Sequence, residues 1–152
     1  MDDTNSAQSA PLRELLAQRV EIQRADLVAR YQDVLQESLF TNRAFVRPSM
    51  LKQIAADEAE ALLNFLRRSG FYSAEHGKEL YQSGFNIASV LKLSQTTCQF
   101  LLDCLEDHQV AFMLDILDSY RQAVTEGYII SMEEEHRIEL ERVRNALTRG
   151  ST

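Results

Sequence analysis

The feature of this sequence that most constrains its fold is a helical apolar pattern that runs from Asp107 almost to the C-terminus. Apolar residues recur there every three or four positions, and no proline follows Pro48. A continuous helix from Asp107 to Thr148 would be about 60 Å long at a rise of about 1.5 Å per residue. A domain of this chain length is only about 30 Å across. We therefore expect the second half of the helix to project from a globular domain.

Residues that form turns are scarce throughout the chain. Its 152 residues include 5 Gly and 2 Pro, far fewer than an antiparallel β-domain needs for its connections. Leu and Ala also outnumber Val and Ile, a balance that favours helices over strands. The sequence therefore predicts an all-α bundle of about five to six helices. It excludes a β-sandwich, a β-barrel, collagen and a disulfide-rich scaffold.

The charge and the cysteine content of the chain exclude several classes of function. The net charge is −7 and the pI is about 5.0, which argues against a nucleic-acid-binding face. Cys98 and Cys104 form neither a CxxC pair nor a metal-binding spacing. No apolar run approaches the ~18 residues of a membrane span, and the acidic, polar N-terminus is not a signal peptide. We expect a cytoplasmic protein without nucleic-acid or membrane partners.

The N-terminal part of the chain predicts a leader and then helix. Residues 1–10 are small, polar and unpatterned, so we expect a disordered leader. A helix is predicted to begin near Pro11, because proline fits the first turn. A polar gap at Gln23 and Arg24 leaves two interpretations open: two helices, or one long helix that changes neighbours.

The next helix has the clearest pattern. Pro48 favours extended backbone at Arg47, Ser49 is the predicted N-cap, and Gly70 stands where a C-terminal cap belongs. The apolar stripe contains Leu51, Ile54, Ala55, Ala59, Leu62, Leu63 and Leu66, and the predicted outer face carries Asp57, Glu58, Glu60, Arg67 and Arg68.

Two more helices are predicted before Asp107. Ser73 begins and Gly84 ends a short helix, and Gly77 weakens its middle. Asn86 is the predicted N-cap of the following helix, in which Ser94 and Cys98 are small residues. They indicate either a close approach of a neighbouring helix or a cavity for a small apolar ligand. The stripe of that helix contains Ile87, Val90, Leu91, Ser94, Cys98, Leu101 and Leu105.

The projecting half of the last helix carries a regular apolar seam. Its spacings are three, four, four, three and four, so an eleven-residue step, close to 3.67 residues per turn, precedes a heptad-like one. The flanking residues are mostly Glu and Arg. Such a stripe cannot be buried by its own chain, so we predict a parallel coiled coil with a second copy; the alternative is a solvated helix that frays. The candidate dimer seam is Ile129, Met132, His136, Leu140, Val143 and Leu147.

These patterns divide the chain into three parts. We expect residues 1–10 to form the leader, residues 11–130 a helical domain, and residues 131–152 a coiled-coil linker that leads away from this domain. Gly127 lies where the last helix leaves the bundle. We hypothesise that it is a flex point between the two halves.

Motifs for catalysis are missing. The sequence contains no GxGxxG, Walker, HExxH or GxSxG motif, so we do not expect an enzyme. Cys104 and His108 are four residues apart beside two aspartates, and we interpret this as an ordinary helix end rather than a metal site. His76 is interpreted as a surface residue rather than a haem ligand, and His136 as a seam residue rather than a phosphoacceptor.

The order of helices is similar to that of a known family. The segment LYQSGFNIASVLKLSQTTCQFLLDCL (80–105) and the final ERVRNAL (141–147) resemble the N-terminal, non-haem globin-like sensor domains of RsbR-type stressosome proteins, the RsbT co-antagonist family. These are relatives of the globin-coupled sensors. The resemblance covers residues 12–149.

The resemblance implies a globin-like bundle that dimerises through its last helices and relays a stress-response signal, of the anti-sigma-factor-antagonist type, to an output domain or partner. Haem-binding relatives carry a histidine near position 82, where this chain has Tyr81, Gln82 and Ser83; this implies no haem and no other cofactor. Two alternatives remain: a haem-binding globin-coupled sensor that uses His76, and a histidine kinase dimerisation or phosphotransfer module that uses His136.

Overall fold

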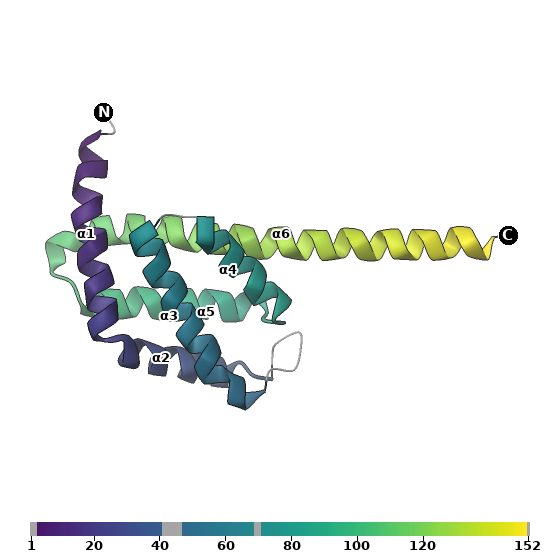
Figure 1. The fold of residues 1–152 in the computed structure, drawn as a ribbon, viewed down its shortest axis with the longest axis horizontal. Coiled ribbons are helices and arrows are strands. Elements are labelled where there is room, and N and C mark those ends of the chain that lie inside the picture. The colour runs from purple at the N-terminus through teal and green to yellow at the C-terminus, as the bar shows by residue number, and fades with distance from the viewer. Residues whose placement is uncertain (1–2, 41–46, 69–70, 152) are drawn as a thin grey trace.

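The computed structural model describes residues 3–40, 47–68 and 71–151. The chain is all-helical in these ranges, which confirms the predicted fold class, with six α-helices and two short 3-10 helices (Figure 1). The elements are α1 (Asp3–Ile22), α2 (Arg24–Glu37), η1 (Pro48–Met50), α3 (Leu51–Arg68), α4 (Phe71–Gln82), α5 (Ile87–Asp103), η2 (Asp107–Gln109) and α6 (Val110–Gly150).

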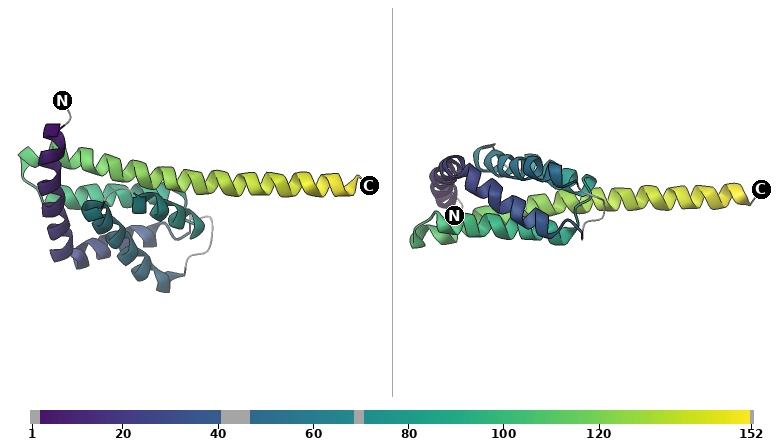
Figure 2. Two further views of the ribbon diagram at one scale, coloured as in Figure 1. Left: turned by 45° about the horizontal axis from the view of Figure 1, so that its top comes forward. Right: turned by 90° about the horizontal axis from the view of Figure 1, so that it is seen from below.

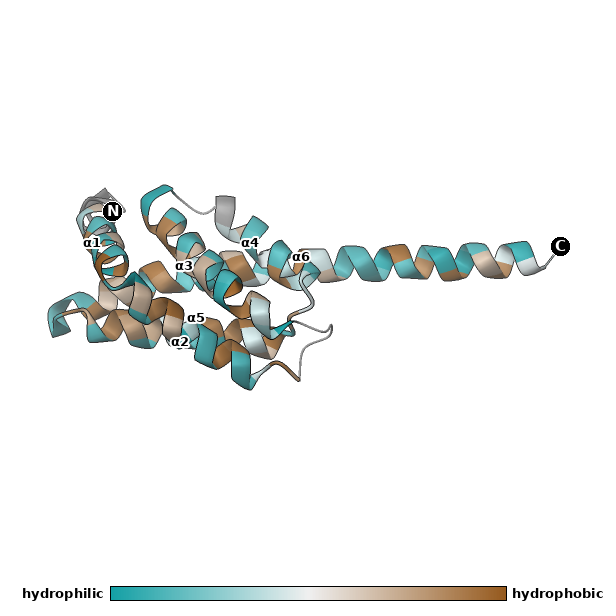
Figure 3. Ribbon diagram, turned by 60° about the horizontal axis from the view of Figure 1, so that its bottom comes forward, coloured by the Kyte–Doolittle hydropathy of each residue, from teal (hydrophilic) through white to brown (hydrophobic). Residues whose placement is uncertain are grey.

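The core is formed where the helices of the bundle pack against one another. α2 packs against α3 and α5, α1 packs on α3, and α4 packs along α6. Among the side chains that the structure describes, Tyr31, Phe85 and Phe100 are the largest that are fully buried. Apolar residues gather where the helices meet in the bundle (Figure 3). No helix in the described ranges has the length and apolar character needed to cross a bilayer.

The last helix projects as predicted. α6 contains 41 residues and is therefore about 60 Å long. Its residues up to Tyr128 contribute to the core, whereas residues 129–151 include no buried side chain. All views show the C-terminal half of α6 extending alone beyond the other helices (Figures 1 and 2).

The N-terminal region corrects one prediction and settles another. α1 begins at Asp3, so residues 3–10 are helical rather than a disordered leader. Pro11 lies inside α1 rather than at its start, where it removes one backbone hydrogen bond of the helix; the alanines before it favour helix. α1 and α2 are separated at Gln23, so the two-helix interpretation of the polar gap is the right one.

Helix α3 begins slightly later than predicted. Arg47 is extended, with φ −69° and ψ 132°, as its position before Pro48 requires. Ser49 lies inside η1 and not at an N-cap. The predicted cap Gly70 lies outside the described residues.

The turn between α4 and α5 follows the sequence signals closely. Gly84 has a positive φ of 89°, which glycine adopts without strain. Its N–H donates to the carbonyl of Tyr81, and the N–H of Phe85 donates to the carbonyl of Leu80. Asn86 then caps α5 by accepting a hydrogen bond of 2.8 Å from the N–H of Ser89. Both predicted boundaries are confirmed.

Helices α4 and α6 approach one another through two glycines. A Cβ added at Gly77 would lie 2.0 Å from the carbonyl oxygen of Val124, and one added at Gly127 would lie 1.9 Å from that of Ala74. Gly77 therefore allows close packing rather than weakening α4. Gly127 is buried inside a continuous helix, so its role is this contact and not the flex point of the sequence-based hypothesis.

Candidate functional site

The predicted seam lies on one side of the projecting part of α6. The helix is continuous through the seam, and a spacing near 3.67 residues per turn keeps these side chains in line. This side lies about 120° around the helix from the one that carries Tyr120, Val124 and Tyr128 into the core. The apolar side chains of the seam remain between 38% and 69% exposed, namely Ile129, Met132, Leu140, Val143 and Leu147.

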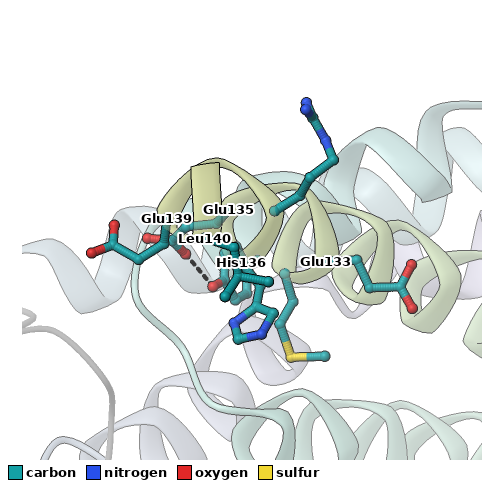
Figure 4. Close-up of a pocket in the computed structure, with 8 residues that line it drawn as sticks. Glu133, Glu135, His136, Glu139 and Leu140 are labelled. Atoms are coloured by element: carbon teal, nitrogen blue, oxygen red, sulfur yellow. Dashed lines mark hydrogen bonds between the residues drawn. The ribbon is translucent and has the colours of Figure 1, made fainter. Parts of the chain in front are cut away.

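A groove follows the seam where α6 leaves the bundle. It has a volume of about 580 Å³ and is lined by Tyr81 of α4 together with α6 residues that include Met132, His136 and Leu140. His136 and Leu140 lie on the same side of α6, while Glu139 extends away from them (Figure 4). The exposed imidazole of His136 thus lies among the apolar residues of the seam.

The charged residues beside the seam are nearly balanced. Residues 129–151 contain five Glu and four Arg. Arg137 and Glu141 form an ion pair of 2.8 Å along the helix, and Arg142 lies 3.8 Å from Glu139. Such exposed pairs contribute little to stability. They do leave this half of α6 without a large net charge.

The exit of α6 from the bundle is fixed by two tyrosines. The hydroxyl of Tyr81 donates to the carboxylate of Glu135 on α6. The hydroxyl of Tyr128 donates to the backbone carbonyl of Phe85 at 2.7 Å. The two tyrosine rings meet edge to face, with centroids 5.2 Å apart. These contacts tie the C-terminal end of α4 to the first turns of the projecting helix.

The two small residues of α5, Ser94 and Cys98, lie in different surroundings. Ser94 lines a recess of about 10 Å³ beside Glu58 and Tyr120, which is room for about one water molecule. Cys98 is half-buried and packs against the core, but it does not line this recess.

The buried side of α5 is turned relative to the predicted stripe. Leu93, Thr97 and Phe100 are buried, whereas Leu91 is 48% exposed. The hydroxyl of Thr97 bonds to the carbonyl of Leu93 and to Tyr31. Because its hydroxyl is satisfied in this way, a polar residue occupies a core position that the apolar pattern does not reveal.

A buried polar cluster lies among α3, α4 and α6. Glu58 is 3% exposed and His76 is 8% exposed, so the sequence-based predictions that they lie on the surface are wrong. The Nε2 atom of His76 contacts one carboxylate oxygen of Glu58. The other carboxylate oxygen accepts a hydrogen bond of 3.3 Å from the hydroxyl of Tyr120.

The environment of His76 shifts its protonation equilibrium. Burial disfavours the imidazolium and lowers the pKa of His76, but the charge and hydrogen bond of the Glu58 carboxylate raise it, with further help from Glu79 and Asp57. The net result is a pKa above the usual value. Burial, followed by the charge of Glu58, also raises the pKa of Tyr31 and Tyr120 well above the usual value, so both remain neutral hydrogen-bond donors.

The sequence carries a signal for this cluster. Glu58 stands three residues after Ala55 and four before Leu62, which is the spacing of the buried stripe of α3. His76 stands three residues after Ser73 and four before Leu80 on the buried side of α4. A charged residue at such a position in each of two neighbouring helices indicates a buried pair.

The position of His76 bears on the haem alternative. Its Nε2 atom is engaged by Glu58, and its Nδ1 atom lies 4.0 Å from Glu79. Ligation of iron through Nε2 would require the Glu58 contact to break. The residues near position 82, where the resemblance places a haem ligand in other members, are Tyr81 and Gln82 at the end of α4.

Cys104 and His108 do not share a helix. α5 ends at Asp103, and His108 lies in the separate η2. Asp103 is paired with Arg30, and the thiol of Cys104 donates to the Oε1 atom of Gln23 at 3.4 Å. Within the described part of the chain, no group of three or more His, Cys, Asp or Glu side chains is arranged to hold a metal ion.

A scan against protein-family models, a search of curated proteins and a search of solved structures each returned no match. The assignment of function therefore depends on the geometry described above.

Proposed function

We propose that this chain is a non-catalytic cytoplasmic sensor module that dimerises through the projecting part of α6 and relays a signal to an output domain or partner protein. The observation that carries the proposal is the exposed apolar seam on a helix that extends beyond its own domain. A lone helix cannot bury such a stripe, and a second copy of the same helix can.

Charge placement supports a second copy as the occupant of the seam. In a parallel, in-register pair, Glu139 of one copy stands opposite Arg144 of the other, five residues further along. Interhelical ion pairs in coiled coils form at this spacing. By symmetry the pair forms twice. An antiparallel arrangement does not bring these two residues together in this way.

The bundle and the seam are parts of one continuous helix, which supports the relay. Tyr120 and Val124 on α6 are packed in the core, and the same helix carries the seam beyond Tyr128. A change in how α6 sits in the bundle is therefore transmitted to the seam without an intervening joint. This is the helix-shift type of switching, in which an input biases two arrangements of one interface. The resemblance to RsbR-type sensor domains agrees with this proposal.

Sedimentation velocity at micromolar concentration tests the dimer. We expect the unaltered chain to sediment as a dimer and Leu140→Glu to sediment as a monomer, because a carboxylate replaces a central seam residue. Ile138→Glu is the matched control, since two residues along a helix place a side chain about 200° away. An unaltered chain that is monomeric, or a dimer that survives deletion of the residues after Ile130, contradicts the proposal.

The two alternatives have their own tests. If His76 binds haem, added hemin gives a Soret band that His76→Ala abolishes; our proposal predicts no such band. If His136 accepts a phosphoryl group, transfer from a kinase is lost in His136→Ala. Our proposal predicts that the oligomeric state depends on the apolar seam residues, with no phosphorylation of His136.

A further inference from the structure

The two glycines make α4 and α6 a single interlocked unit. At Gly77 and Gly127 the backbone of each helix touches the carbonyl of the other, with no side chain between them. Close backbone packing of this kind leaves no room for sliding without separation of the helices. A movement of α4 therefore takes α6 with it.

The unit is attached to α3 by a polar contact. His76, the residue before Gly77, contacts Glu58 of α3. Tyr120 of α6 donates to the same carboxylate. Glu58 thus holds both members of the α4–α6 unit, through side chains that are almost completely buried.

The charge of this contact depends on one proton. With His76 protonated, the imidazolium and the Glu58 carboxylate cancel. With His76 neutral, the carboxylate is left as an uncompensated buried charge, which is costly. Two acidic groups lie near the pair, Asp57 on α3 and Glu79 on α4. The hydroxyls of Tyr31 and Tyr120 are neutral.

One cation lies close by on α6. Arg121 lines the same small recess as Glu58, but its guanidinium is half-exposed and forms an ion pair with Asp118. His76 therefore supplies the positive charge that is in direct contact with Glu58.

The C-terminal end of α4 is attached to the projecting part of α6. Tyr81 contacts Glu135 on α6, and Tyr128 donates to the carbonyl of Phe85 just beyond α4. A shift of the α4–α6 unit on α3 therefore moves the projecting helix with it and changes the direction of the seam relative to α3.

We propose that the Glu58–His76 pair is a proton-dependent latch that fixes the α4–α6 unit on α3, and that its opening changes how the seam residues pair. The effect on seam pairing rests on the proposed dimer. The latch itself concerns a single chain and is tested separately.

The latch is tested by an intramolecular distance. Spin labels are placed on α3 and α6 at Lys52→Cys and Gln122→Cys, both exposed positions, after Cys98 and Cys104 are replaced by Ser. Leu140→Glu is included, so that only distances within one chain are measured whether or not the chain dimerises. We expect the mean distance between labels to be longer at about pH 9 than at about pH 6.

The matched control is the double variant Glu58→Gln, His76→Gln, in which a neutral hydrogen-bonding pair replaces the charged one. We expect its label distance to be the same at both pH values. If the double variant does not fold, Glu58→Gln alone serves, because it removes the buried charge and keeps His76. A distance that does not change with pH in the labelled parent, or that changes equally in the control, overturns the latch.

The coupling to the seam is tested in the chain without Leu140→Glu. A single label at Asn145→Cys, an exposed position on the side of α6 opposite to the seam, reports the distance between two copies, and we expect this distance to shift over the same pH range. A label distance at Asn145 that is independent of pH, while the intramolecular distance changes, overturns the coupling and leaves the latch. A chain that never dimerises while the latch opens overturns the proposed dimer instead.

Discussion

Replacement of Gly127 by alanine should destabilise this protein, although the same change in most helices is stabilising. An added Cβ would lie 1.9 Å from the carbonyl oxygen of Ala74 and 2.8 Å from its Cα. These are backbone atoms, so no side-chain rotation relieves the overlap. The two helices must separate by about 1 Å or more before ordinary contact distances return.

The size of the effect follows from two opposing contributions. Overpacking of a closely packed interior costs about 1–3 kcal/mol, and a backbone clash belongs at the upper end of this range. Alanine recovers about 1 kcal/mol of helix propensity relative to glycine. We expect a net loss of about 2 kcal/mol, which lowers Tm by about 4–8 °C for a chain of this size.

Thermal unfolding followed by circular dichroism measures this loss. Gly150→Ala is the control, because a Cβ there meets nothing within 4 Å; its Tm should be unchanged or slightly higher. Gly77→Ala should resemble Gly127→Ala, and the double variant should cost less than the sum, since the first substitution already separates the helices. A Tm that rises in Gly127→Ala would refute the close α4–α6 crossing.

Three further predictions concern single contacts. The pKa of His76 is higher in the folded than in the unfolded chain. The stabilisation from its pair with Glu58 is therefore fully present below about pH 6.5 and is lost as the pH rises through the folded-state pKa. Urea unfolding from about pH 6 to 9 should show this loss in the parent and not in the double variant Glu58→Gln, His76→Gln. Asn86→Ala should cost about 1 kcal/mol through loss of the α5 N-cap, and Asn86→Ser should retain most of it in the same assay. Tyr128→Phe leaves the carbonyl of Phe85 without its donor and should cost about 1–3 kcal/mol; an unchanged midpoint would show that this hydrogen bond does not hold α6.

The sequence predicts the helices better than their contacts. Gly84 and Asn86 mark the turn between α4 and α5 because each residue type satisfies a local backbone requirement. The length of α6 follows from an unbroken apolar period. Such features depend on neighbouring residues only, so they can be read without knowledge of the fold.

Features that depend on two distant segments are harder to predict. Glu58 was expected on the outer face because charged residues are usually exposed, and only the opposing His76 on α4 explains its burial. Gly77 and Gly127 were interpreted separately, as a weak point and a flex point. Their common role emerges only when α4 and α6 are placed side by side.

The exposed apolar stripe on the projecting part of α6 was predictable for a related reason. Residues 129–147 include no buried side chain, so their pattern is not masked by bundle packing. The predicted stripe of α5 includes the buried Val90 and Leu101 but misses Leu93 and Thr97. Thr97 occupies a core position through its hydrogen bonds to Leu93 and Tyr31. A pattern of apolar residues does not predict the burial of a polar residue whose hydrogen bonds are all formed inside the protein.

Cysteine cross-linking within the seam tests the central claim most directly. In a background with Cys98 and Cys104 replaced by Ser, Val143→Cys places one thiol in the seam of each copy, and Asn145→Cys places it on the opposite side of α6. A parallel, in-register pair predicts rapid formation of a disulfide-linked dimer by Val143→Cys and little by Asn145→Cys under mild oxidation. Equal cross-linking at the two positions, or none at Val143→Cys, would contradict pairing through the seam.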